Sequence, residues 1–146
     1  MARLDETNAP IAYSGMDPRK APILFAMVAL GIYTIVHLAL PETLAVQLAT
    51  VMLALIGGAY IGFAARVHDA RSFWIEMSTA LLFGVFAFLG LSVHWLFIPL
   101  GLFLHGLWDF LHHLRDFGAP VPQWYIPFCA IFDVAAAAVI TLLFVL

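Results

Sequence analysis

The sequence predicts an all-α fold, a polytopic membrane helix bundle with five transmembrane helices. Of its 146 residues, 64% are hydrophobic and only 10% are charged, whereas a soluble domain carries roughly a quarter charged residues. The mean hydropathy is +1.03. The apolar residues also gather into five stretches, each near the roughly 20 residues that a helix needs to cross the hydrocarbon core.

Each predicted helix is bounded by residues that helices or membranes disfavour. Pro41 ends the first helix and Arg66 follows the second. Pro99 and Pro127 fall in or near the first turn of the fourth and fifth helices, where a missing backbone N–H costs least. The expected spans are residues 21–40, 43–65, 73–92, 95–114 and 124–146.

The organisation is one membrane domain after a short tail. Residues 1–20 are polar and predict a cytoplasmic tail, and residues 21–146 predict a single transmembrane domain. The first 20 residues hold no apolar core before a small-residue cleavage site, so we expect the first helix itself to direct insertion.

The basic residues predict the topology. With five spans, all of them fall on one side of the membrane, and the opposite loops carry none: Arg3, Arg19, Lys20, Arg66, Arg71 and Arg115. Because cytoplasmic loops are enriched in Lys and Arg, the N-terminus is expected in the cytoplasm and the C-terminus outside. The predicted location is the cytoplasmic (inner) membrane, which the chain crosses several times.

Charge and cysteine content exclude some classes of function. A net charge of −3 is too small and too scattered to indicate a nucleic-acid partner. The single cysteine, Cys129, forms no intramolecular disulfide. The expected partners are membrane lipids. A homo-oligomer and a larger membrane complex both stay open.

The fourth predicted helix carries an unusual number of polar groups. Helical geometry, at about 100° per residue, places His105, Asp109 and His112 on one stripe, with His113 one step round. Tyr60, in the second predicted helix, lies at a similar depth to Asp109. Polar groups are costly inside a bilayer, so they need partners or a function.

Topology supplies acidic partners from two other helices. Asp133, in the fifth predicted helix, lies at about the depth of His105. Glu76, in the third, lies near the level of Asp109 and His112. An isolated charge near a helix centre costs about 2.5 kcal/mol or more, so a shared intramembrane polar cluster is expected.

The cluster is compatible with several kinds of chemistry. Imidazole and carboxylate groups suit a divalent metal such as zinc, manganese or iron. The candidate ligands are His105, Asp109, His112, His113, Glu76 and Asp133. Metal-free acid–base catalysis is the second interpretation, and for either reaction the candidate catalytic residues are His105, Asp109, Asp133 and Glu76. An isoprenoid or another lipid entering from the bilayer would suit as substrate.

Non-catalytic roles stay open as well, so the sequence leaves undecided whether the protein is an enzyme. It could be an accessory subunit of a larger complex or a small proton, ion or solute carrier, or the polar network could only fix helix register. His37 and His94 are expected at the opposite, outer ends of their helices, where water is available. Gly57, Gly58 and Gly62 in the second predicted helix include a small-xxx-small pair that predicts close approach of another helix.

Two motifs resemble the signature of an uncharacterised family of small multi-spanning membrane proteins of bacteria and fungi. The first runs from His105 to His113 as HGxWDxxHH, and the second from Val121 to Asp133 as VPxWYxPFCxxxD. The resemblance covers mainly residues 55–140 and leaves out the tail and the first helix. It implies a shared fold and a shared site at these positions. The family is classed as a domain of unknown function and implies no activity.

Overall fold

The computed structural model describes residues 20–114 and 118–145, except the side chain of His113. The predicted tail lies outside these residues, apart from Lys20. The described residues are organised as α1 (Ala21–Ala39), α2 (Glu42–Ala64), α3 (Ala70–Ser92), α4 (Phe97–Leu114) and α5 (Tyr125–Val145). The all-α prediction is confirmed.

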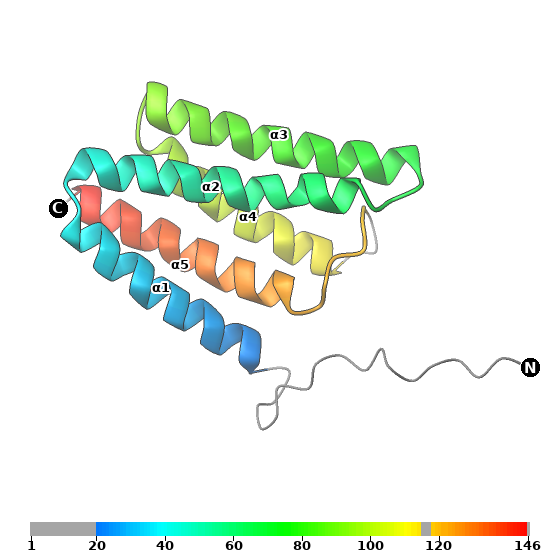
Figure 1. Ribbon diagram of the computed structural model, residues 1–146, viewed down its shortest axis with the longest axis horizontal. Coiled ribbons are helices and arrows are strands. Elements are labelled where there is room, and N and C mark those ends of the chain that lie inside the picture. Colours follow the sequence, from blue (N-terminus) through cyan, green and yellow to red (C-terminus); the bar gives the residue numbers. More distant parts are fainter. Residues whose placement is uncertain (1–19, 115–117, 146) are drawn as a thin grey trace, which may run out of the picture.

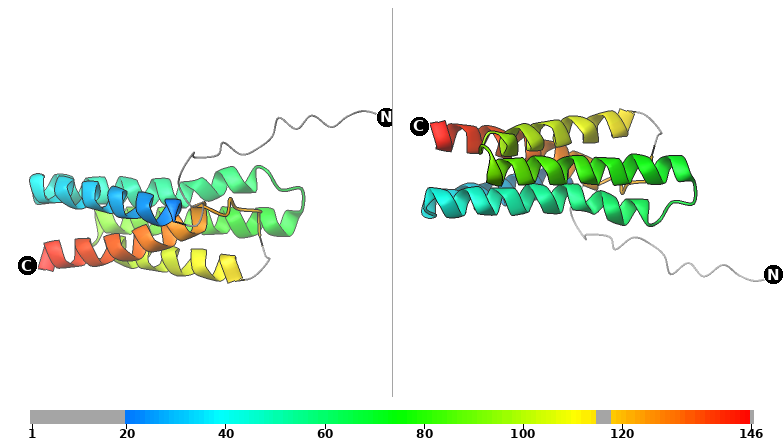
Figure 2. Two further views of the ribbon diagram at one scale, coloured as in Figure 1. Left: turned by 90° about the horizontal axis from the view of Figure 1, so that it is seen from below. Right: turned by 90° about the horizontal axis from the view of Figure 1, so that it is seen from above.

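The helices lie side by side and run alternately in opposite directions (Figures 1 and 2). The closest neighbours are α2 with α3, α4 with α5, and α1 with α5. α3 also packs on α4, whereas α1 makes few contacts with α2 despite the short turn between them. The start of α1, the link between α2 and α3, the end of α4 and the start of α5 therefore lie at one end of the bundle.

Four of the helices, α1, α2, α3 and α5, are long and apolar enough to cross a membrane. The chain is a multi-pass membrane protein. Helix α4, the shortest of the five with 18 residues, is not among these four. These four helices agree with four of the five predicted spans.

The surface and the interior have the polarity expected for a membrane bundle. Large apolar side chains face outward, such as Leu55 at 67% and Leu81 at 70% exposure. The acidic side chains of Glu76, Asp109 and Asp133, by contrast, have no exposed area. Lipid can solvate the first group and not the second, so the polar groups gather inside.

The predicted boundaries differ from the observed ones by at most three residues. The largest difference is at α3, which begins at Ala70 and not at Phe73. The carboxylate of Asp69 accepts a hydrogen bond of 2.8 Å from the backbone N–H of Ser72. This N-cap starts the helix within the polar link, before the apolar run that marked it in the sequence.

The cap makes one prediction about stability and pH. The hydrogen bonds from Ser72 lower the pKa of Asp69 below its ordinary value of 3.8. The stabilisation is therefore fully present above that value and is lost as pH falls through the lower pKa of the folded state. We expect Asp69→Ala to lower the midpoint of thermal unfolding at pH 7. Asp69→Asn keeps an acceptor and serves as the control; equal midpoints for the two variants would contradict the cap.

Candidate functional site

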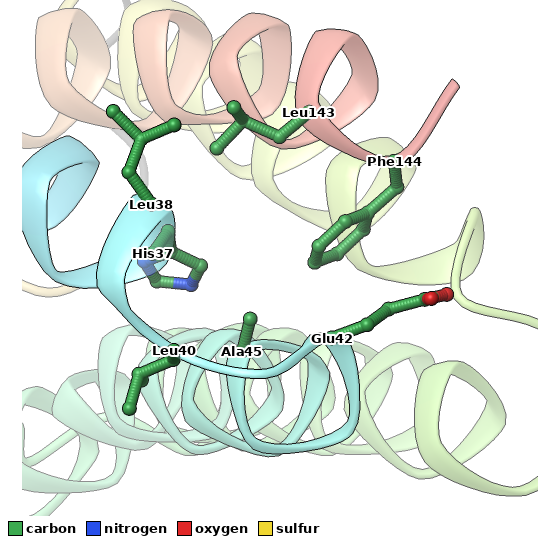
Figure 3. A pocket seen from close by; sticks show the side chains of 7 residues that line it. All are labelled: His37, Leu38, Leu40, Glu42, Ala45, Leu143 and Phe144. Carbon is green, nitrogen blue, oxygen red and sulfur yellow. The ribbon is translucent and has the colours of Figure 1, made fainter. Parts of the chain in front are cut away.

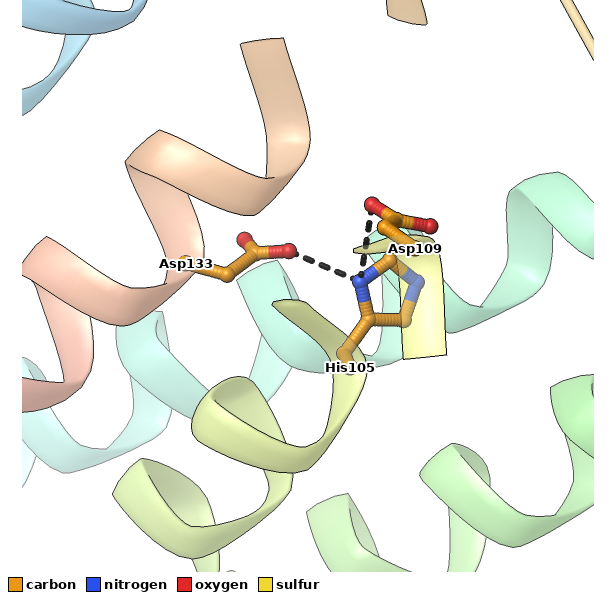
Figure 4. Close-up of side chains that lie close together, drawn as sticks. All are labelled: His105, Asp109 and Asp133. Atoms are coloured by element: carbon orange, nitrogen blue, oxygen red, sulfur yellow. Dashed lines mark hydrogen bonds and ion pairs between the residues drawn. The ribbon is translucent and has the colours of Figure 1, made fainter. Parts of the chain in front are cut away.

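The most polar part of the interior is formed by α4 and α5. His105 and Asp109 stand one turn apart on α4, and Asp133 comes from α5. All three side chains have no exposed area. His105 Nδ1 lies 2.7 Å from Asp133 Oδ2 and 3.6 Å from Asp109 Oδ2. Figure 4 shows both carboxylates directed toward this same ring nitrogen.

A glycine allows the two helices to come this close. A Cβ on Gly106 would lie 2.9 Å from Cγ2 of Val134 and 3.2 Å from the carbonyl oxygen of Ala130. These are closer than side-chain carbons normally approach. The residue that follows His105 thus permits the close packing of α4 on α5 that brings the imidazole to Asp133.

Helices α2 and α3 complete the surroundings of the imidazole. The Tyr60 hydroxyl, from α2, donates a short hydrogen bond to Asp109 Oδ1. The Tyr60 and Phe83 rings meet the His105 ring edge to face, with centroids 5.4 and 4.7 Å away. The aromatic rings seal the cluster from lipid, while the tyrosine hydroxyl holds one carboxylate in position.

Several polar atoms of the cluster remain without a hydrogen-bond partner among the described residues. They are His105 Nε2, Asp109 Oδ2 and Asp133 Oδ1. No described lysine or arginine forms an ion pair with either aspartate. Two carboxylates thus share a single imidazole in a medium of low dielectric constant. Such an arrangement requires shared protons or a cation.

One ligand atom from each of the three side chains can be chosen so that all lie within 4.8 Å of one another. His105, Asp109 and Asp133 therefore form a group that could hold a metal ion. The structure brings together these three of the six candidate ligands. The sequence predicts Asp133 at the depth of His105, and Glu76 at the level of Asp109 and His112. In the structure, Asp109 lies instead with His105 and Asp133.

Glu76 and His112 form a second, neighbouring pair. His112 Nε2 lies 3.9 Å from Glu76 Oε1. The loop before α5 joins them: the Ala119 N–H donates to Glu76 Oε1 at 2.6 Å, and His112 Nε2 donates to the Ala119 carbonyl at 3.2 Å. The remaining candidate ligand, His113, lies outside the described side chains.

Sequence reasoning missed the loop that holds this pair. Gly118 has a φ of 82°, a left-handed conformation that suits glycine. A Cβ at this position would contact Glu76 Oε1, and it would lie 3.1 Å from His112 Cε1. Nothing in a short loop of proline and glycine signals that its backbone contacts a glutamate 43 positions away.

This geometry predicts that Gly118→Ala is destabilising. The left-handed backbone costs an alanine about 1–2 kcal/mol, and its methyl group displaces the Glu76 carboxylate from Ala119. We expect a loss of that size or larger in the free energy of unfolding, measured in mixed detergent micelles. Gly84→Ala, where an added Cβ meets nothing within 4 Å, is the control. Equal stability of the two variants would contradict the contact.

The chain was compared with known families, curated proteins and solved structures. The model of a family of unknown function, DUF6010, matches residues 21–144. The chain belongs to this family. The match includes α1, so it extends beyond the part that carries the resemblance in the sequence. Neither the curated proteins nor the solved structures gave a significant match.

Proposed function

We propose that His105, Asp109 and Asp133 bind one divalent metal ion within the bundle. The supporting observation is the group of two carboxylates and one imidazole with ligand atoms within 4.8 Å. Two carboxylates and a neutral imidazole carry two negative charges, which one divalent ion balances. The alternative, two uncompensated charges at sites with no exposed area, is costly inside a membrane.

The ligand types also limit the choice of metal. One nitrogen and two carboxylate oxygens suit zinc, manganese or iron better than a thiolate-preferring ion. Three protein ligands leave a coordination position open, as catalytic zinc sites do. The hydrogen bond from Tyr60 would orient Asp109, in the way that outer groups commonly position metal ligands.

We infer that the site serves an enzyme that acts on a lipid or isoprenoid substrate. A metal bound here would polarise a substrate oxygen or activate a water molecule. Glu76 is the candidate acid–base group beside it, because its Oε2 has no hydrogen-bond partner among the described residues. An apolar groove of about 750 Å³ runs between α4 and α5 on the outer face. It includes Val134, next to Asp133, so an acyl or isoprenoid chain could lie against it.

A proton-transfer site is the second candidate function. Tyr60 donates to Asp109, and the carboxylates of Asp109 and Asp133 both face Nδ1 of His105. These four neighbouring side chains can exchange protons, which favours metal-free acid–base catalysis or proton conduction. With this function, as with the metal site, activity would be lost when Asp109 or Asp133 is replaced, but it would not require a metal ion.

For the topology, we propose that α4 is the fifth span and that the end of the bundle with Arg66 and Arg71 faces the cytoplasm. The packing of α4 on α3 and α5 supports the span, because the side chains of His105, Asp109 and His112 are buried inside the bundle. The positive-inside rule supports the orientation and with it the inner membrane. We also propose that the motif residues from His105 to Asp133 are the shared site of the family.

Elemental analysis of the purified protein, prepared without a histidine tag, tests the metal. We expect about one zinc, manganese or iron ion per chain, because the described residues hold one group of three candidate ligands, His105, Asp109 and Asp133. His105→Ala and Asp133→Asn should each reduce the metal content to about a tenth or less.

His94→Ala is the matched control, because His94 is exposed and lies far from the cluster. It should keep the full metal content. If the wild-type protein neither carries nor takes up any of the three metals, the metal site is excluded and the proton-transfer function is favoured.

A further inference from the structure

A pocket with polar and apolar walls lies at the opposite end of the bundle from the His105 cluster, between the α1–α2 turn and the end of α5. Its volume is about 330 Å³. The lining residues are His37, Leu38, Leu40, Glu42, Ala45, Leu143 and Phe144 (Figure 3). The pocket shares no residue with the His105 cluster, so conclusions about it do not depend on the proposed metal.

His37 directs an unpaired nitrogen into this pocket. The sequence predicts an imidazole in contact with water, but the side chain is only 4% exposed. Its Nδ1 lies 2.8 Å from the Tyr33 carbonyl oxygen. A carbonyl only accepts hydrogen bonds, so Nδ1 carries the proton, and in the neutral ring Nε2 is an acceptor. Nε2 has no hydrogen-bond partner among the described residues, and Figure 3 shows the ring pointing into the pocket.

The rest of the pocket adds acceptors and negative charge. Glu42 lies across the pocket from His37, with its carboxylate at the rim (Figure 3). It is in the first turn of α2, where it offsets the positive end of that helix. The last backbone carbonyl groups of α1 also lie at this end of the bundle, and Pro41 has no N–H that could donate a hydrogen bond to them. The negative end of the α1 dipole therefore adds to the preference for a cation.

The remaining five lining residues are leucine, alanine and phenylalanine side chains. A matching ligand needs an N–H donor for His37 Nε2 and a positive charge that the Glu42 carboxylate at the rim attracts, together with an apolar chain for these walls. We propose that the pocket binds the primary ammonium group of an amphipathic amine. Its volume lies near the lower limit for small-molecule sites. It therefore holds the head group, while the chain lies along exposed apolar surface such as Leu38.

Native mass spectrometry of the full-length protein in detergent tests this proposal. The probes are dioleoyl phosphatidylethanolamine, which has N–H donors, and dioleoyl phosphatidylcholine, which has none. Dodecylamine and dodecyltrimethylammonium form the same comparison without a phosphate. We expect the primary amine of at least one pair to bind at least tenfold better than its quaternary partner. Preference within the phospholipid pair alone identifies a lipid head group, and preference within the dodecyl pair alone identifies a free amine.

His37→Phe should reduce this preference at least tenfold, and Glu42→Gln should weaken binding of the primary amine at least tenfold. His94→Phe is the control, because it removes an exposed histidine near the same end of the bundle. If His37→Phe does not fold, Glu42→Gln decides the question, because the Glu42 side chain is exposed at the rim. Equal binding of primary and quaternary amines, or binding unchanged in Glu42→Gln, would overturn the proposal.

Discussion

His105→Leu is expected to destabilise the bundle by about 3–5 kcal/mol, the usual cost of removing one partner from a buried charged network. The imidazole is the group that Asp109 and Asp133 share, at 3.6 and 2.7 Å. Leucine has a similar size but no polar atom, so both carboxylates would stay buried without it. The free energy of unfolding, measured by titration from mild detergent into SDS micelles, checks this expectation.

Two further variants separate the loss of the network from a loss of packing. His94→Leu changes an exposed histidine, so its effect should stay within about 0.5 kcal/mol. Replacing His105 by Leu together with Asp109→Asn and Asp133→Asn removes the carboxylate charges, and should recover part of the stability lost in His105→Leu. A single variant as stable as His94→Leu would show that the imidazole does not support the two aspartates. A triple variant less stable than the single one would point to packing as the cause.

Much of the fold could be predicted because a membrane helix corresponds to one continuous apolar stretch of the sequence. Runs of apolar residues near the span length, interrupted at Pro41 and Arg66, place the helices to within three residues. Helix α4 is the exception. It carries most of the polar groups of the site, and it is the one described helix that is not among the four candidate membrane spans.

The site could be predicted in outline and not in its pairing. Depth along antiparallel helices placed His105 level with Asp133, and the two are in fact 2.7 Å apart. Depth does not determine how each helix is rotated about its axis. Asp109 was for this reason expected beside Glu76, whereas it accepts a hydrogen bond from Tyr60 and lies with His105. The Glu76 carboxylate instead accepts a hydrogen bond from the backbone N–H of Ala119. A backbone group of this kind cannot be recognised from the type of side chain at that position.

The same limit applies to the glycines of α2. The sequence predicts that Gly57, Gly58 and Gly62 let another helix approach α2 closely. Gly57 does so, whereas an added Cβ at Gly58 or Gly62 meets nothing within 4 Å. A Cβ on Gly57 would lie 2.6 Å from the Cβ of Phe83 in α3. Helix rotation, set by the whole bundle, decided which glycine faces the neighbour.

Gly57→Ala is therefore expected to cost about 1–3 kcal/mol, the usual range for overpacking a tight interior. The neighbouring atom belongs to the base of the Phe83 side chain, which cannot swing away, so α2 and α3 must separate. Tyr60 is on α2, three residues from Gly57, and Phe83 packs on His105. The same shift should therefore disturb the surroundings of the imidazole. Unfolding in SDS micelles measures the cost, and metal content or proton uptake measures the effect on the site.

Gly58→Ala provides a matched control one residue away on the same helix. Its added methyl group faces open space, and replacing a mid-helix glycine by alanine commonly stabilises a helix by about 0.5–1 kcal/mol. The two substitutions are chemically identical and should have opposite signs, so a general effect of alanine on helix α2 cannot explain the difference. If both variants are equally stable, α2 does not pack on α3 through Gly57, and the position of Tyr60 beside Asp109 loses its structural basis.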